Sequence, residues 1–132
     1  MDLSEDLYNS NMSLHFVSKG WGYEKWICNN EKYCGKILHF VKGRQCSLHY
    51  HKLKDETFFV SSGMVRLSYV GIAPDAPIPE VPLMSQVILS KGDAFHIPPY
   101  TLHQVFALED SEIIEVSTQH FDEDSYRVQK GD

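Results

Sequence analysis

Two histidines and a glutamate lie close together in the segment HYHKLKDE, which covers residues 49–56. His49 and His51 are two residues apart, so on a β-strand both side chains point to the same face. Residues 52–55 have the composition of a turn, which would bring Glu56 back beside the histidines at the start of the next strand. Imidazoles and a carboxylate that face inward from neighbouring strands are typical ligands of a divalent metal ion.

A fourth ligand is expected from a distant part of the chain. His103 follows a turn marked by Pro98 and Pro99. Taken alone, the pair His49-x-His51 is more typical of two solvated or hydrogen-bonded side chains on a half-exposed strand than of a metal site. The metal hypothesis therefore depends on the elements around these residues.

Those elements are predicted to be β-strands. From Trp21 onward, short segments rich in aromatic and β-branched residues alternate with turn residues, and Gly43, Gly63 and Gly92 mark the turns. The expected strands cover residues 23–28, 33–41, 45–51, 56–62, 64–70, 85–90, 93–99, 103–108 and 112–118. No segment has a helical period over three turns. This pattern predicts an all-β sandwich or barrel.

The length of 132 residues indicates one domain. Residues 1–19 are polar, and we expect an N-terminal arm or an edge strand there, followed by a single β-barrel domain over residues 20–132. Residues 71–82 contain four of the six prolines, which predicts a loop between strands. This loop is either a surface insertion or a lid over a pocket.

Composition excludes several classes of protein. The net charge of −6 argues against a nucleic-acid or membrane-surface binder. The sequence has no long apolar run and no signal-peptide pattern, so we expect a cytoplasmic protein. The three cysteines, Cys28, Cys34 and Cys46, form no CxxC pair and are expected to be reduced, although Cys28 and Cys34 could face each other across a hairpin.

The residues around the histidines form a motif in two halves. In the first half, Gly43 and five residues precede His49-x-His51, and four residues, Glu56, six residues and Gly63 follow. In the second half, Gly92 and five residues precede Pro98, and His103 comes next. This double motif resembles that of the cupin superfamily over about residues 21–120, with Tyr100 where the family commonly has glycine.

The resemblance implies a jelly-roll β-barrel with His49, His51, Glu56 and His103 as metal ligands. Three imidazoles and one carboxylate suit several divalent ions; we expect zinc, with iron, manganese or nickel as alternatives. Phe58, Val60 and Val105 have the strand parity of wall residues inside such a barrel.

A closer resemblance is to the cupin domain of type II mannose-6-phosphate isomerases. It rests on Trp21-Gly22, Lys36, Ser47-Leu48, Phe58 and the segments IPPYTLHQV (97–105), IEVST (114–118) and DEDSYR (122–127). That family has glutamine where His49 stands and usually arginine where Lys54 stands. The resemblance implies an isomerase that interconverts an aldose and a ketose, acting on a sugar or a sugar phosphate.

Such a reaction needs a base for the proton, stabilisation of the oxyanion, and cations if the substrate carries a phosphate. Lys54 and Glu115 are the candidate catalytic residues, and no spacing singles out either as the base. Lys36, Phe58 and Arg127 are the candidate substrate-binding residues, with Lys54 and Arg44 as further candidate anchors. By strand parity His96 should face away from the metal, and His15, His39 and His120 carry no motif.

Two other functions stay open. The same ligands could hold iron in a dioxygenase, or the barrel could bind a carbohydrate or another small molecule without turnover. The Trp-Gly start and the IEVST and DEDSYR segments favour the sugar branch over the oxygenase branch. Apolar residues occur on both faces of the expected strands, so we expect a homodimer with Ile37 and His39 at its interface.

Overall fold

The computed structural model describes residues 15–132, which form eleven β-strands and one short 3-10 turn. The strands are β1 (His15–Lys19), β2 (Gly22–Asn29), β3 (Cys34–Phe40), β4 (Leu48–Tyr50), β5 (Glu56–Ser62), β6 (Met64–Gly71), β7 (Ser85–Ser90), β8 (Ala94–Ile97), β9 (Thr101–Ala107), β10 (Ser111–Ser117) and β11 (Tyr126–Gln129). The 3-10 turn η1 (Asp122–Asp124) connects β10 to β11.

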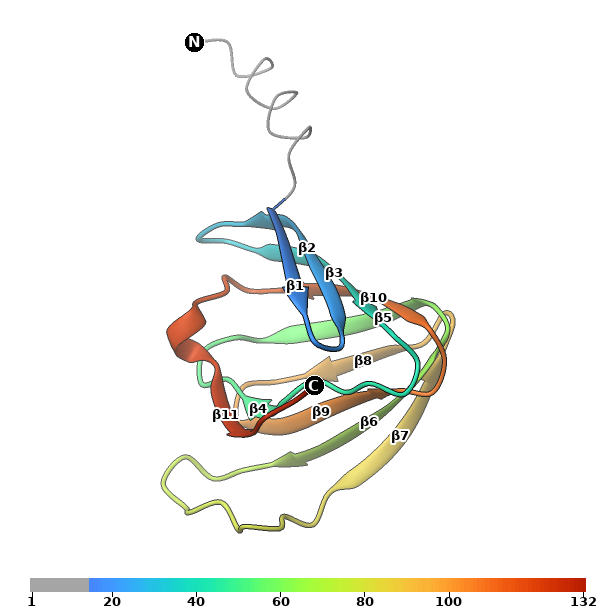
Figure 1. Cartoon of the computed structure of the whole chain (residues 1–132). Coiled ribbons are helices and arrows are strands. Elements are labelled where there is room, and N and C mark those ends of the chain that lie inside the picture. Colours follow the sequence, from blue (N-terminus) through green and yellow to red (C-terminus); the bar gives the residue numbers. More distant parts are fainter. Residues whose placement is uncertain (1–14) are drawn as a thin grey trace, which may run out of the picture.

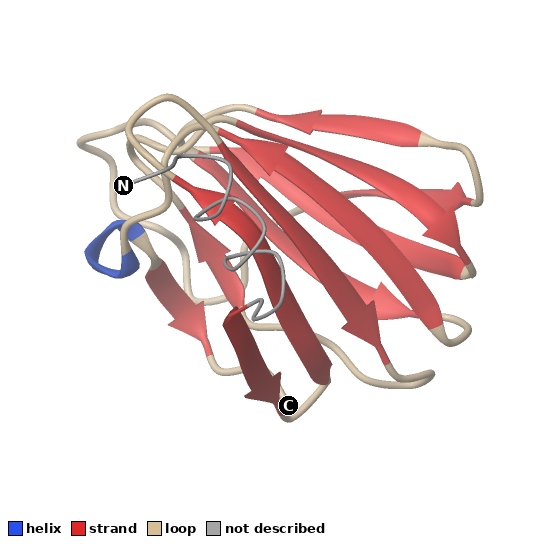
Figure 2. Ribbon diagram, turned by 90° about the horizontal axis from the view of Figure 1, so that it is seen from above, coloured by secondary structure: helices blue, strands red, loops and turns tan. Residues whose placement is uncertain are grey.

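The strands form two antiparallel sheets that face each other as a jelly roll (Figure 1). One sheet has the order β1-β2-β3-β10-β5-β8, and the other has the order β11-β4-β9-β6-β7. Figure 2 shows the two layers from above, with strands as almost all of the regular secondary structure. The expected all-β jelly-roll fold is confirmed.

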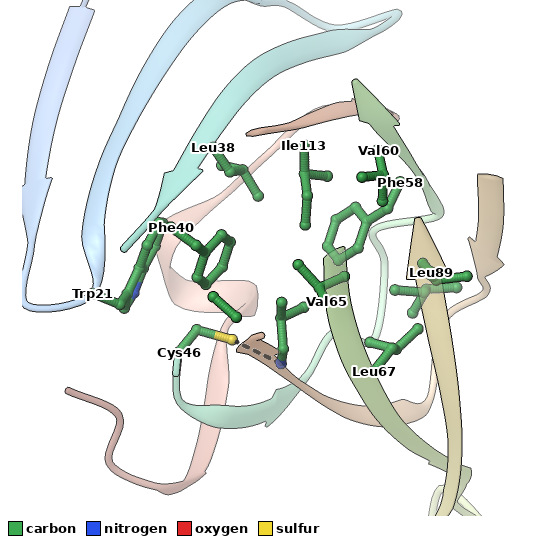
Figure 3. Close-up of a cluster of buried hydrophobic side chains, with 13 residues drawn as sticks. Trp21, Leu38, Phe40, Cys46, Phe58, Val60, Val65, Leu67, Leu89 and Ile113 are labelled. Carbon is green, nitrogen blue, oxygen red and sulfur yellow. Dashed lines mark hydrogen bonds between the residues drawn. The ribbon is translucent and has the colours of Figure 1, made fainter. Parts of the chain in front are cut away.

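The core lies between the two sheets, because the strands alternate inward and outward residues. In β3 the side chains of Lys36, Leu38 and Phe40 are buried, whereas Ile37 and His39 between them are half-buried on the outer face. Figure 3 shows the apolar side chains of this core, among them Phe40, which stacks on Trp21 with ring centroids 4.1 Å apart. The apolar core therefore forms the inner walls of the barrel.

The N-terminal edge of the described chain is part of the barrel. Residues 15–19 form β1, an edge strand that pairs with β2 from His15↔Trp26 to Lys19↔Gly22. Of the expected arm or edge strand over residues 1–19, residues 1–14 lie outside the described residues. The segment β11 was not expected as a strand, because its four residues are mostly exposed and show no alternation.

Tyr100 adopts the backbone conformation that usually favours glycine. Its φ is +59°, and no other non-glycine residue of the described chain has a positive φ. The Tyr100 amide donates to the His51 carbonyl at 2.8 Å, and the Tyr100 carbonyl accepts the Ile72 amide at 2.9 Å. These two hydrogen bonds hold the turn although the residue at this place is a tyrosine.

The proline-rich loop joins β6 to β7 and is largely exposed. In Figure 1 it extends beyond the ends of these two strands, away from β1 and β2. Residues 72–84 do not contribute to the wall of the main cavity described below. Of the two alternatives for this loop, the structure has the surface insertion.

The three cysteines are free thiols, as expected. Cys28 lies opposite Gly35 and Cys34 lies opposite Asn29, so the two cysteines do not face each other across the β2–β3 hairpin. Residues 15–132 contain no helix that is long and apolar enough to cross a membrane.

Candidate metal centre and active site

The four expected metal ligands come together from both sheets. His49 on β4 lies directly opposite His103 on β9, and His51 follows immediately after β4. The ligand nitrogens of these three histidines lie within 4.8 Å of one another. Glu56, the first residue of β5 in the facing sheet, places Oε2 3.3 Å from His51 Nε2 and 3.8 Å from His103 Nε2.

Each histidine of the cluster is oriented by a backbone carbonyl. The distances from Nδ1 to the carbonyl oxygen are 2.9 Å for His49 to Ser47, 3.0 Å for His51 to Asp124, and 2.8 Å for His103 to Thr101. Because a carbonyl oxygen can only accept, each Nδ1 carries the proton and each Nε2 keeps its lone pair. Histidines that bind metals through Nε2 are commonly held in this way.

The electrostatics of the cluster fit a divalent cation. Burial lowers the pKa of His51 to about 3 and of His103 to about 4, and burial followed by the charge of His103 lowers the pKa of His49 well below its usual value. All three imidazoles are therefore neutral at ordinary pH, which is the form that binds metals.

Two ligand atoms also lack any protein partner. Glu56 Oε2 and His103 Nε2 are buried, and neither makes a hydrogen bond to the described chain. An unpaired buried polar atom is costly, and a bound cation between the two would satisfy both atoms. Burial and then the nearby Glu115 carboxylate raise the pKa of Glu56, and a cation at this place would favour its ionised form. The three histidines and Glu56 thus fit a divalent metal ion.

A buried ion pair lies in the same cavity as the histidine cluster. Lys54 Nζ lies 2.7 Å from Glu115 Oε2, and both side chains are at most 5% exposed. Burial alone would raise the pKa of Glu115, but Lys54 and Lys36 together lower it. Burial alone would lower the pKa of Lys54, but Glu115 and Glu56 together raise it. The pair is therefore a carboxylate and an ammonium group at ordinary pH.

Lys36, expected to reach the pocket, lies beside this pair. Its side chain is buried, with Nζ 3.7 Å from Glu24 Oε1 and 4.0 Å from the centroid of the Trp26 ring. Trp26 Nε1 donates to the same Glu24 oxygen at 2.8 Å. Burial lowers the pKa of Lys36, and Glu115 partly opposes this effect. Both buried lysines of the cavity thus have a carboxylate as their partner.

The cavity that contains these groups has a volume of about 590 Å³. Phe58 and Val105 form part of its apolar wall, as expected, whereas Val60 lies deeper in the core. Arg127 on β11 is an exposed residue that borders the cavity. Most of the other lining residues are polar or charged, and they include the histidine cluster and the Lys54–Glu115 pair.

Two expectations at the edge of the site have opposite outcomes. Arg44, a candidate anchor for a phosphate, is exposed and does not line the cavity, because the chain between β3 and β4 carries it over the outside of the barrel. That part of the hypothesis was wrong. His96 faces away from the cluster, as expected from its parity, and its Nε2 lies 2.6 Å from Asp55 Oδ1 on the surface.

Several residues of the site were not found by sequence reasoning. His120 lines the cavity with Nδ1 3.3 Å from Lys54 Nζ and Nε2 3.0 Å from Asp122 Oδ1. His15 also lines the cavity, and its ring meets Trp26 edge-on with centroids 5.1 Å apart. His120 lies three residues after the end of β10, the strand that carries Glu115, and this proximity was the one signal in the sequence for its place.

Comparison with known proteins gives a family and a fold. A family model described as "Cupin domain" matches residues 36–118. A D-lyxose ketol-isomerase of Thermofilum sp. is 34% identical over 110 residues, which cover 72% of this chain and 61% of that protein. A D-lyxose/D-mannose isomerase of Thermosediminibacter oceani is 30% identical over 111 residues, covering 74% and 61%. The chain spans about three fifths of the length of these curated relatives.

Solved structures with a similar fold include KdgF from Halomonas sp., with a TM-score of 0.66 and 22% identity over 83% of this chain and 91% of that one. The capsular polysaccharide assembling protein CapF from Staphylococcus aureus has a TM-score of 0.71 and 18% identity, over 89% of this chain and 33% of that one. These similarities support the jelly-roll fold alone. The family match extends from β3 to the end of β10 and includes all four candidate ligands, so the chain belongs to the cupin family.

Proposed function

We propose that the protein is a metal-dependent isomerase that interconverts an aldose and a ketose. The observation that carries this proposal is the buried Lys54–Glu115 pair, which lies in the same cavity as the four candidate metal ligands. The two curated relatives, a D-lyxose ketol-isomerase and a D-lyxose/D-mannose isomerase, support the same class of reaction. We expect a small sugar with the lyxose or mannose configuration at C2 as the substrate.

The pKa directions assign a role to each member of the pair. Glu115, kept ionised by its two lysine neighbours, accepts the proton from C2 of the aldose and returns it to C1. The O2 hydroxyl loses its proton as C2 becomes a carbonyl, and this proton passes to O1, so that the reaction is balanced. Lys54, kept protonated by Glu115 and Glu56, donates a hydrogen bond to the substrate oxygen on which negative charge develops. A divalent ion held by His49, His51, Glu56 and His103 would add positive charge at the same oxygen.

Zinc is the ion that we propose for this site. Three imidazoles and a carboxylate are within its usual ligand set, and isomerisation needs a Lewis acid without redox chemistry. Elemental analysis of the purified protein tests this choice. Iron in place of zinc, together with oxygen consumption, would favour the dioxygenase alternative.

The pairing of the two buried lysines of the cavity favours an uncharged sugar over a sugar phosphate. Lys36 and Lys54, the two buried lysines, each lie beside a carboxylate, so neither is free to bind a phosphate. Arg127, Lys19 and Lys130 are the other cations that border the cavity, and among them Arg127 is the candidate partner for a phosphate on the non-reacting end of a longer substrate. We therefore propose free D-lyxose or D-mannose as the first substrates to test and mannose 6-phosphate as the third.

The test is an assay of the metal-loaded protein with these three sugars, with detection of D-xylulose, D-fructose or fructose 6-phosphate. Turnover of a free sugar supports the proposal, and Arg127→Gln should leave that turnover unchanged. If mannose 6-phosphate is the better substrate, Arg127→Gln should raise its KM by about 10-fold, the effect of one charged hydrogen bond. Saturable binding of a sugar without product would instead identify a non-catalytic binding protein.

We also propose that the protein is a homodimer. Ile37, Ile114 and Phe59 are Cα partners across three neighbouring strands on the outer face of the six-stranded sheet. Val116 and Ile27, on the same sheet, are 54% and 49% exposed. His39 lies on this face as well and stacks on Tyr23. A continuous apolar face of this kind is costly in water, and a second copy of the chain would cover it.

A further inference from the structure

Asp124 is a buried carboxylate outside the candidate catalytic and metal-binding residues. It is the last residue of the 3-10 turn η1, and only 3% of its surface is exposed. Its carboxylate accepts three consecutive backbone N–H groups, from Lys52 at 2.9 Å, Leu53 at 3.1 Å and Lys54 at 3.0 Å. Its backbone carbonyl accepts the Nδ1–H of His51 at 3.0 Å.

These four hydrogen bonds join Asp124 to four consecutive residues, 51–54. Residues 51–54 lie between β4 and β5, where no strand pairing fixes the backbone. The segment begins with a candidate metal ligand, His51, and ends with a candidate catalytic residue, Lys54. Its conformation is held by a distant part of the sequence, because Asp124 is at least 70 residues away along the chain.

The geometry points to Asp124 as a positioning residue that holds His51 and Lys54 at a set distance from each other. This inference rests on the proposed function, since it presumes a metal ion at the histidine cluster. The carboxylate fixes the loop that carries both residues, and the carbonyl fixes the ring of His51. One residue therefore couples the metal cluster to the Lys54–Glu115 pair.

A carboxylate is the group that this role requires. Its two oxygens can accept several N–H donors at once, whereas an asparagine in the same place would turn an NH₂ group toward at least one of them. The carboxylate also ties the turn η1 to residues 52–54. If the turn moves, the carbonyl that orients His51 moves with it. Changes at groups that orient a metal ligand commonly reduce metal affinity by about 10- to 100-fold.

Cobalt titration of the full chain tests this inference. Co²⁺ binding is followed by its visible absorption in the wild type, in Asp124→Asn and in a control variant, Asp110→Asn. The control removes a carboxylate that also accepts a distant backbone N–H, from Lys42 at 2.8 Å, but at an exposed site that does not line the cavity. We expect Asp124→Asn to raise the Kd for Co²⁺ by about 10- to 100-fold and to change the absorption bands. Asp110→Asn should keep both within about twofold, the scale of a surface substitution.

Kinetics with the active sugar give a second reading. A positioning role predicts that Asp124→Asn, loaded with saturating metal, lowers kcat while KM changes little. If this variant does not fold, Asp124→Glu, which keeps both oxygens on a longer side chain, replaces it in both measurements. If the wild type binds Co²⁺ and the folded variant shows the same Kd and the same absorption bands, the inference about Asp124 is overturned, but the proposed metal site is not. A wild type that binds no Co²⁺ would overturn the proposed metal function and this inference with it.

Discussion

Lys54 and Glu115 form an ion pair with 2.7 Å between Nζ and Oε2, in the interior of the barrel and beside three clustered histidines. Buried ion pairs add little net stability, because removing two charges from water costs about as much as their attraction returns. A pair in this place is therefore better explained by chemistry than by stability. A role in chemistry and a role in stability can be distinguished, because they predict different results when both residues are replaced.

Removing one partner should be more damaging to the fold than removing both. Lys54→Met leaves an unpaired buried carboxylate and should reduce the free energy of unfolding by about 3–5 kcal/mol. The double variant Lys54→Met, Glu115→Leu should recover most of this loss, as measured by urea denaturation. Isomerase activity should fall by at least 100-fold in the single and the double variant, because each lacks Lys54, which stabilises the developing oxyanion, and the double variant also lacks Glu115, which moves the proton. An active double variant would contradict the assigned roles.

Metal removal should destabilise the protein and abolish turnover together. A chelator should lower the Tm of the wild type, and adding back the ion at 100 times its Kd should restore about 2.7 kcal/mol of stability. His103→Gln removes one ligand and should lose most of this response, whereas His96→Gln, on an exposed side chain, should keep it. A Tm that does not respond to the chelator in the wild type would contradict the metal site.

The stability of the metal-free protein should fall as the pH is lowered from about 6.5 to about 4. The pKa of His51 is lowered from 6.5 to about 3 and that of His103 to about 4, so in this range the unfolded chain binds protons that the folded chain does not. Each histidine adds a slope of about 1.4 kcal/mol per pH unit in this range. Glu56 opposes them, because its raised pKa lets the folded chain bind a proton that the unfolded chain releases.

Denaturation at a series of pH values measures this slope. His103→Gln should reduce it by about one histidine's share, about 1.4 kcal/mol per pH unit. Val105→Ala, a cavity-forming change in the same buried strand, should lower stability at every pH without altering the slope. An unchanged slope in His103→Gln would mean that this histidine is not held neutral in the folded state.

The proposed dimer can be tested with one substitution on each sheet. Ile37→Lys places a charge in the apolar row of the six-stranded sheet and should convert a dimer to a monomer in sedimentation velocity. Ile88→Lys, at a 57% exposed position on β7 of the other sheet, should leave the oligomeric state unchanged. A monomeric wild type at micromolar concentration would contradict the proposal.

The local sequence predicted the strands and the faces of their side chains well, because both depend on short-range regularities. Alternation with a period of two assigns each strand residue to a face, and glycines at fixed spacings mark the turns. Hence the inward parity of Glu56, Phe58 and Val60 was predicted correctly, as was the outward parity of His96. Lys54 and Glu115 were identified as candidates by type, but no spacing in the sequence indicated that they are partners.

The sequence by itself determined which side chains face into the barrel, because strand parity is a local property of the chain. The tertiary structure decided which of those side chains meet, because that depends on strand register and on loops that cross between the sheets. Lys54 meets His120 across 66 residues, and Asp124 meets His51 across 73. The irregular turn at residues 122–124 has no periodic signature, and only its packing against residues 51–54 makes Asp124 part of the site.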